Sequence, residues 1–129
     1  MPQSITDRIR AEIHAGAMVP KPSAPESYRI KGWGRRRGEQ ALVYFIPSRG
    51  NPNYPHEKGI TETEFEHAWH QLLQAGELTR RWFNGKLPAC AREGSCNFTT
   101  IGGIFELLGE ASYSSRGIYR RTSGKTDNR

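Results

Sequence analysis

The segment from Ile60 to Gly76 constrains the fold of this sequence more than any other. Thr61 and Glu64 have the T-x-x-E spacing of a capping box, and Gly76 stands where a C-terminal helix cap belongs. Between the caps, apolar residues recur with the period of one helix face, at Phe65, Ala68, Trp69, Leu72 and Leu73. We therefore expect an amphipathic helix whose apolar face packs on the rest of the domain and whose outer face is acidic.

A β-hairpin with a basic tip is expected before this helix. β-forming residues run from Tyr28 to Trp33 and from Leu42 to Ile46, on either side of the glycine-bounded segment 34–38. The first strand and the tip carry the cations Arg29, Lys31, Arg35, Arg36 and Arg37. Residues 47–59 are rich in turn formers and are expected to be a long loop. Earlier still, isoleucines at every fourth position predict a short helix over 4–15, and prolines predict a linker over 18–27.

After the central helix, the pattern has the order of a winged helix-turn-helix. It predicts a short helix at 80–83, a loop over 86–95, a helix over 98–108 and a strand pair at 111–113 and 118–121. In that interpretation the helix over 98–108 is the recognition helix, and Arg116, Arg120 and Arg121 lie on the wing. An ordinary α+β core whose last helix merely packs is the alternative, because the first turns of that helix contain no Arg or Lys.

Two consecutive glycines, Gly102 and Gly103, interrupt the apolar pattern of this last helix. Each weakens a helix by about 1 kcal/mol relative to Ala. They are expected to serve close packing or the close approach of a ligand.

The fold class that follows is α+β, as one small domain over residues 1–121. It has an N-terminal helix, a basic β-hairpin, a central amphipathic helix, a winged-helix-like helical unit and a C-terminal strand pair that can join the first sheet. Residues 122–129 are expected to be a disordered basic tail.

Charge points to a polyanionic partner. Lys and Arg number 19 against 13 Asp and Glu, for a net charge of +6, and 14 of the cations are Arg. The guanidinium group binds phosphate or a guanine edge in a bidentate way that Lys does not match. Asp occurs only at Asp7 and Asp127, which disfavours an ordinary two-metal nuclease.

We therefore expect a nucleic-acid-binding protein, with DNA favoured over RNA. A regulatory role is one function that such binding would serve. Trp33 or Tyr119 would stack on an unpaired base. The expected binding residues are Arg29, Lys31, Trp33, Arg35, Arg36, Arg37, Arg116, Tyr119, Arg120 and Arg121.

Two alternatives belong to other classes, although the sequence leans against an enzyme. A metal-independent nuclease or hydrolase would use His56 with Glu57 or Glu39 and an arginine. A protein-binding inhibitor or adaptor would dock through the acidic face of the central helix, with Trp82 or Phe83 exposed beside it. Besides nucleic acid, a protein partner or the formation of a homodimer is compatible with the sequence.

A zinc site is an alternative that the sequence does not favour. His67 and His70 are neighbours on a helix, and Cys90 and Cys96 follow, but the spacing matches no common zinc finger and cysteines are as readily small core residues. No cofactor is expected. The longest apolar run, 41–46, is too short to span a membrane. No signal peptide is recognisable in residues 1–8, so a cytoplasmic protein with reduced thiols is expected.

Overall fold

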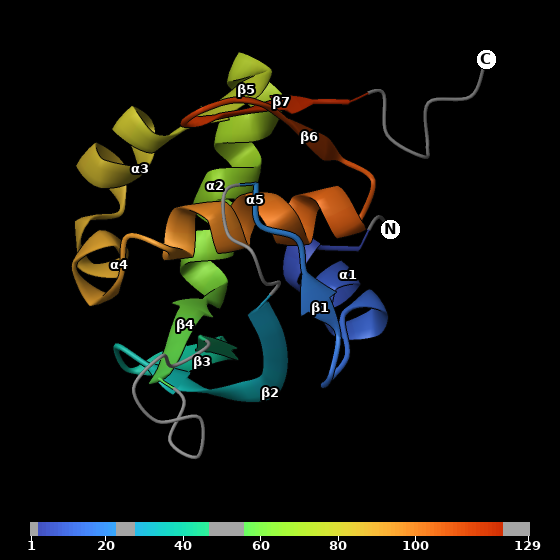
Figure 1. The fold of residues 1–129 in the computed structure, drawn as a ribbon, viewed down its shortest axis with the longest axis vertical. Helices are drawn as coiled ribbons and strands as arrows, with labels where there is room; N and C mark the ends of the chain where they lie inside the picture. Colours follow the sequence, from blue (N-terminus) through green and yellow to red (C-terminus); the bar gives the residue numbers. More distant parts are fainter. Residues whose placement is uncertain (1–2, 23–27, 47–55, 123–129) are drawn as a thin grey trace.

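One buried helix lies between two antiparallel sheets at the centre of the fold (Figure 1). The computed structural model describes residues 3–22, 28–46 and 56–122. The central helix, α5, is Asn97–Leu107. The first sheet has the strand order β1 (Met18–Val19), β2 (Tyr28–Arg36), β3 (Glu39–Ile46) and β4 (His56–Thr61). The second sheet has the order β5 (Glu77–Thr79), β7 (Ile118–Arg121) and β6 (Ala111–Ser115). The expected α+β class is confirmed.

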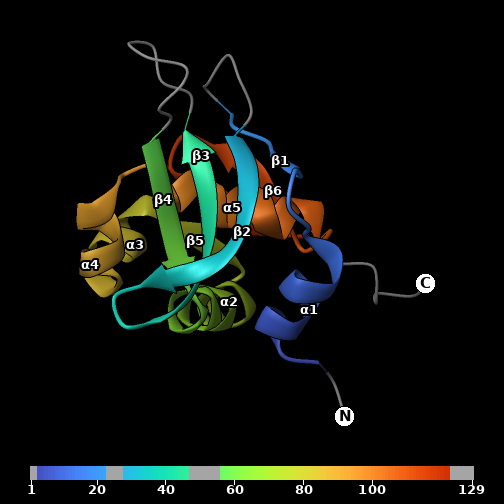
Figure 2. The ribbon, with the colours of Figure 1, turned by 90° about the horizontal axis from the view of Figure 1, so that it is seen from below.

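The other helices surround this centre. They are α1 (Ile5–Glu12), α2 (Glu62–Ala75), α3 (Arg80–Lys86) and α4 (Pro88–Glu93). Helices α1 and α2 pack on each other, and they lie side by side at one edge of the molecule in Figure 2. Among the described residues, no helix is both long enough and apolar enough to cross a bilayer.

The central amphipathic helix is confirmed as α2, with both caps. The Thr61 side chain accepts a hydrogen bond from the Glu64 amide, and the Glu64 carboxylate accepts one from the Thr61 amide. At the other end Gly76 has a φ of 77°, the left-handed conformation that favours glycine in a C-terminal cap. Phe65, Ala68 and Leu72 on its apolar face are fully buried.

The basic hairpin is confirmed as β2 and β3, with a tighter turn than the sequence indicates. Only Arg37 and Gly38 form the turn, and both have positive φ, at 51° and 78°. Positive φ at both positions suits the twist of a two-residue hairpin turn. Arg35 and Arg36 stand in the strand, opposite Gln40 and Glu39.

Three expected irregular segments contain regular structure. Residues 56–59 belong to β4, because pairing along β3 satisfies their backbone groups despite their turn-forming composition. Residues 88–93 form α4, with Pro88 at the first helical position, where proline needs no amide partner. Met18 and Val19 form β1, paired with β2. The rest of the expected loop, 47–55, and the expected tail from 123 onward lie outside the described residues.

The C-terminal strand pair does not join the first sheet. It pairs instead with β5, directly after α2, so the two basic hairpins belong to separate sheets on opposite sides of α5. A Cβ built on Gly103 of α5 would lie 2.8 Å from the Pro20 carbonyl oxygen, which shows how closely the residues at β1 approach the helix. The helical unit and its hairpin keep the expected order, but α5 is covered on both sides.

Candidate functional site

The turn of the first hairpin is held by carboxylates. Arg37 donates to both oxygens of Glu64, at 2.8 and 2.7 Å, and to Glu93 at 2.7 Å, and its side chain is only 22% exposed. Hydrogen bonds to Glu64 raise the pKa of Arg37. Burial acts to raise the pKa of Glu64, but the hydrogen bonds from Arg37 and from the Thr61 amide outweigh it and hold that pKa below its ordinary value. Arg37 therefore ties the hairpin to α2 and α4.

Arg36 and Arg35, the two residues of β2 that precede Arg37, differ in their partners. Arg36 donates to Glu93 at 3.1 Å and lies 3.9 Å from Glu57. Arg35 is exposed and donates to the Gly38 carbonyl. Two of the three arginines expected at the tip are thus neutralised by neighbouring glutamates, and Arg35 is the one left for solvent.

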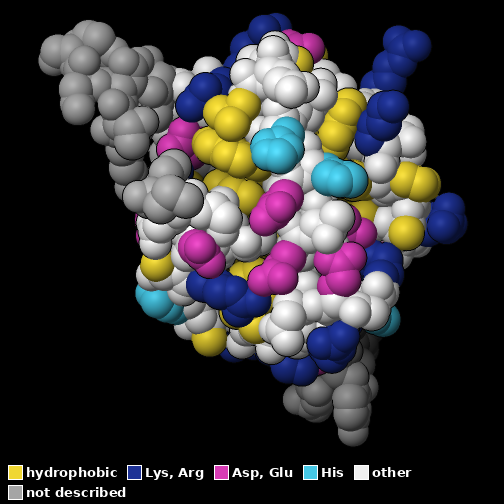
Figure 3. All heavy atoms as spheres, turned by 180° about the vertical axis from the view of Figure 1, so that it is seen from behind, with side chains coloured by type: hydrophobic (Ala, Val, Ile, Leu, Met, Phe, Trp, Pro, Cys, Tyr) yellow, Lys and Arg dark blue, Asp and Glu magenta, His cyan; other side chains and the backbone are white. Residues whose placement is uncertain are grey.

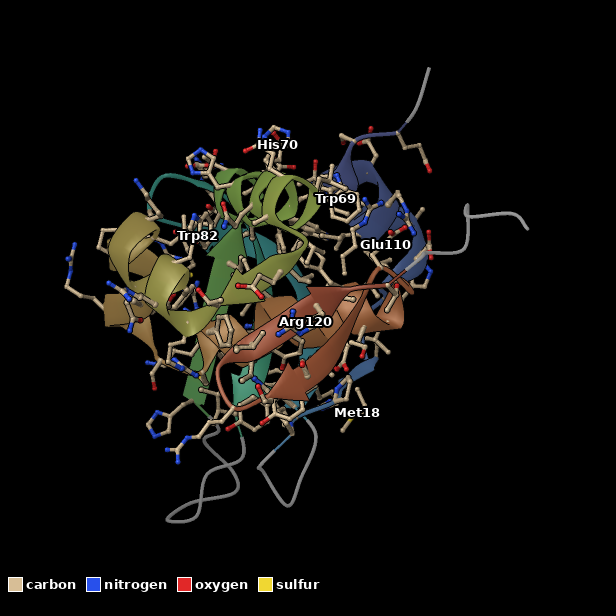
Figure 4. The ribbon with its side chains drawn as sticks, turned by 90° about the horizontal axis from the view of Figure 1, so that it is seen from above. Met18, Trp69, His70, Trp82, Glu110 and Arg120 are labelled. Carbon is tan, nitrogen blue, oxygen red and sulfur yellow. The ribbon has the colours of Figure 1, made fainter. Side chains whose placement is uncertain are left out.

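The other expected binding residues are spread over several surfaces. The Arg29 guanidinium lies 4.6 Å from the centre of the Phe45 ring, and Lys31 pairs with Glu57. The Trp33 ring is covered by the Arg10 guanidinium, 3.8 Å from its centre. On the second sheet, the exposed side chain of Arg120 pairs with Glu77, and that of Arg121 lies 3.8 Å from Glu110 (Figure 4).

The expected stacking role of Tyr119 is wrong. Its ring is fully buried between α5 and its own sheet and packs edge-on against Phe98 and Tyr113. A base cannot reach a ring in this position. Phe83, expected at an exposed docking surface, is also fully buried, whereas Trp82 is half-buried.

The structure brings a different set of cations together in a pocket of about 540 Å³. The pocket lies where the residues after β1, the start of β2, the starts of α3 and α5 and the β6–β7 turn converge. Among the residues that the structure describes, its lining holds three cations and no carboxylate: Lys21, Pro22, Tyr28, Arg80, Ser95, Thr99, Tyr113, Arg116 and Gly117. We call this feature the cationic pocket.

Lys21 is half-buried, and its ammonium group is fixed against the start of α5. Its Nζ donates to the Cys96 carbonyl at 3.1 Å, Thr99 Oγ1 at 2.9 Å and Thr100 Oγ1 at 2.6 Å. It also lies 4.2 Å from the centre of the Tyr28 ring. Burial lowers the pKa of Lys21 to about 7, and the nearby Arg80 charge acts in the same direction. All three N–H donors of Lys21 are engaged by protein oxygens, so its ammonium group is held in place and acts on a ligand through its charge.

Arg80 and Arg116 supply the other two charges. The Arg80 Nη1 donates to the Ser95 carbonyl at 3.0 Å, and its guanidinium lies 4.8 Å from the centre of the Phe98 ring. Arg116 is exposed in the two-residue turn between β6 and β7, next to Gly117, which has a φ of 79°. The sequence singled out Arg116 for the wing, whereas Lys21 and Arg80 were missed because no local pattern joins them.

The cationic pocket and the first hairpin's turn are at different ends of the molecule. Tyr28, in the pocket lining, and Arg36, beside the turn, stand at opposite ends of β2. Figure 2 shows the β2–β3 turn at the bottom of the view and the start of β2 at the top. The sequence-based expectation of a single basic face made by both hairpins is therefore not met.

The residues proposed for hydrolysis do not converge. His56 is opposite Ile46 at one end of β3, whereas Glu39 is opposite Arg36 at the other end. Glu57 follows His56 on the strand and therefore points to the other face of the sheet, where it pairs with Lys31.

The four residues weighed for zinc are also apart. His67 and His70 are exposed on α2, Cys90 is fully buried and Cys96 lies 3.2 Å from the Tyr44 hydroxyl. Burial raises the pKa of the Cys90 thiol, which disfavours the thiolate that zinc requires. No group of three His, Cys, Asp or Glu side chains that could hold a metal ion occurs in the described ranges.

The face over α2 is acidic. Figure 3 shows carboxylates gathered there beside two histidines, and the exposed outer positions of α2 include Thr63, His67 and His70. Glu62 and Glu64 of this helix pair with Arg10 and Arg37, so the described residues of this face offer no cationic surface, and the face lies outside the candidate site.

Comparisons with family models, with curated proteins and with solved structures found no match.

Proposed function

We propose that the protein binds nucleic acid through the cationic pocket and the β6–β7 turn beside it. The observation that carries the proposal is the grouping of Lys21, Arg80 and Arg116 in one pocket, where no carboxylate belongs to the described part of the lining. Arg37, by contrast, spends its donors on Glu64 and Glu93. Phosphate groups dominate the affinity of proteins for nucleic acids, and cations without a carboxylate partner are the groups that bind them.

Aromatic side chains in the same lining favour nucleic acid over other polyanions. Tyr28 and Tyr113 line the pocket with the three cations. Because the Tyr28 ring is stacked on Tyr44 and has Lys21 over it, Tyr113 is the ring proposed to meet a base. Stacking of bases on aromatic rings next to a cationic path is how many proteins hold unpaired strands. Arg116, exposed in the β6–β7 turn, adds a cation beside this lining, and we take DNA as the partner because arginine also binds the edge of guanine.

The proposed contacts are to the backbone and to exposed bases, because α5 is not placed to read a groove. Its residues from Phe98 to Phe105 are buried except for the half-buried Thr99. We therefore expect binding with weak sequence preference and a steep dependence on salt.

The test is fluorescence anisotropy with labelled single-stranded and duplex DNA of mixed sequence at two salt concentrations. The variant Arg80→Ala with Arg116→Ala is compared with a control that removes the same charge elsewhere, Arg81→Ala with Arg92→Ala, both exposed and outside the lining. We expect the pocket variant to lose affinity about tenfold or more and the salt slope to fall by about two, one for each lost phosphate contact. Equal affinity of the two variants would contradict the proposal.

A further inference from the structure

We infer that the cationic pocket takes the terminal phosphomonoester of a DNA strand, rather than a phosphate within the strand. This inference rests on the proposed function and names the part of the nucleic acid that enters the pocket. Three observations support it: the Lys21 ammonium group is fixed on the inner side of the lining, the lining is cationic, and the first turn of α5 lies beside it.

Depth favours a strand end. Lys21 is half-buried, but its Nζ donates to Thr99 and to the buried Thr100 in the first turn of α5, so the ammonium group lies on the inner side of the lining. A phosphate inside a strand carries a nucleotide on each side, and those two nucleotides hold it at the rim. A terminal phosphate carries a nucleotide on one side only and is able to approach the inner side of the lining.

Charge favours a monoester over a diester. A phosphomonoester carries a charge of about −1.5 to −2 near neutral pH and has three free oxygens, against one charge and two free oxygens for a diester. The lining offers Arg80, Arg116 and the protonated form of Lys21, and its described residues include no carboxylate to compete. The more highly charged group gains more from three cations that already repel one another.

The start of α5 adds to this preference. Ser95 and Thr99 in the lining flank the first turn of α5, and its N-cap residue, Cys96, makes no side-chain capping hydrogen bond. The first two amides of α5 donate to the Gly94 and Ser95 carbonyls, so this end of α5 adds the positive potential of the helix dipole and not free donors. Tyr113, which is half-buried in the same lining, is where the base attached to the terminal phosphate would stack.

The experiment compares DNA ends on the full chain. Single-stranded 12-mers of one sequence carry either a 5′-phosphate with the fluorophore at the 3′ end or a 3′-phosphate with the fluorophore at the 5′ end. Each is compared with a hydroxyl strand, which has the fluorophore at the same end and a hydroxyl group in place of the phosphate. We expect one of the two phosphorylated strands to bind about tenfold more tightly than the hydroxyl strand, because charge-assisted hydrogen bonds to the extra oxygen and charge are strong. Which strand gains identifies the end that is recognised.

Variants show whether the preference comes from the pocket. Arg116→Ala, in an exposed turn, is expected to reduce the preference to less than about threefold, and Lys21→Met is expected to do the same. Arg81→Ala should keep the full preference, since Arg81 is exposed outside the lining. The Arg116 variant keeps the test usable if removal of Lys21 prevents folding.

The outcomes separate the two proposals. Salt-sensitive binding with equal affinity for phosphorylated and hydroxyl strands overturns the inference and leaves the proposed function standing. A preference that survives Arg116→Ala and Lys21→Met also overturns it, because the phosphate then binds elsewhere. Absence of binding to any of the strands and to the duplex overturns both.

Discussion

Gly102 of α5 lies directly against the ring of Tyr119 in β7. A Cβ built on Gly102 would overlap the ring carbons of Tyr119, at a separation that real Cβ atoms do not show. The helix and the second sheet approach each other at this point more closely than any other residue would allow. The glycine pair in the sequence therefore serves close packing here.

Substitution of Gly102 by alanine is expected to destabilise the protein. Tyr119 is fully buried and has no room to move, so the free energy of unfolding should fall by about 1–3 kcal/mol, as for overpacked cores. The control is Gly85→Ala in α3, where nothing lies within 4 Å of the added Cβ. That change should be neutral or stabilise by up to about 1 kcal/mol through helix propensity. Urea denaturation measures both, and equal effects would contradict the packing argument.

Arg37→Ala is expected to lower the free energy of unfolding by about 1–3 kcal/mol at neutral pH, because it leaves Glu64 and Glu93 without their main donor. Arg35→Ala, two residues away and exposed, should change it by less than about 0.5 kcal/mol. Chemical denaturation of the two variants and the wild type provides the comparison. Similar losses for both would show that the tip arginines are interchangeable.

The cost of Arg37→Ala should depend on pH. Hydrogen bonds from Arg37 hold the pKa of Glu64 below its ordinary value despite burial, and the pKa of Glu93 is lowered in the same way. A depressed carboxyl pKa contributes stability above the unfolded value of about 4.3, and this contribution is lost as the pH falls through the folded value. The difference between wild type and variant should therefore shrink below pH about 4. A difference that is constant from pH 7 to pH 3 would contradict this account.

Lys21 should make the protein more stable as the pH rises above 7. Burial lowers its folded pKa to about 7 from an ordinary value of 10.5, so the unfolded chain holds more protons between these values and the free energy of unfolding increases with pH. The slope is at most about 1.4 kcal/mol per pH unit. The charged and titratable groups around Lys21 are Arg80, Cys96, Tyr28 and Tyr44.

Lys21→Met removes this slope while it keeps the length of the side chain. Unfolding by urea at pH 7.0 and pH 8.5 is the measurement. The unfolded Cys90 thiol begins to ionise near the upper end of this range, but it does so in both proteins, so the difference between them reports Lys21. The rise in the wild type should be absent in the variant. The same rise in both proteins would assign it to another group.

Tyr44→Phe is expected to lower the free energy of unfolding by about 1–3 kcal/mol. The buried Tyr44 hydroxyl donates to Asn97 Oδ1 at 2.6 Å, and the Asn97 Nδ2 donates to the Cys90 carbonyl at 2.9 Å. Removal of the hydroxyl leaves a buried oxygen without its donor between the first sheet and α5. Tyr113→Phe, on a half-buried ring in the pocket lining, is the matched control and should cost less. Thermal denaturation of the two variants decides between them.

Local sequence patterns were enough to predict much of the fold. Capping of α2 depends on Thr61, Glu64 and Gly76, all within one segment, so sequence spacing was enough to place both ends. The hairpin of β2 and β3 followed for the same reason. The strand at His56–Thr61 was hidden, because its backbone is satisfied by β3 and not by anything in its own composition.

The candidate site was far less predictable. The sequence shows Arg36 and Arg37 as two cations of the hairpin. It does not show that glutamates from α2 and α4 neutralise them, because Glu64 and Glu93 are distant in the chain. Lys21 was hidden in a proline-rich stretch, and only the packing of that stretch on α5 gives it three oxygen partners.

The sequence by itself determined the α+β class, the capped central helix, the first hairpin and the excess of arginine, because these depend on residues close together in the chain or on composition alone. Only the tertiary structure decided which cations are neutralised and which line a pocket, and that α5 is covered on both sides. The reason is physical: the charge that a ligand meets is set by neighbours in space, and a buried pair or a pocket forms between segments that no sequence spacing connects.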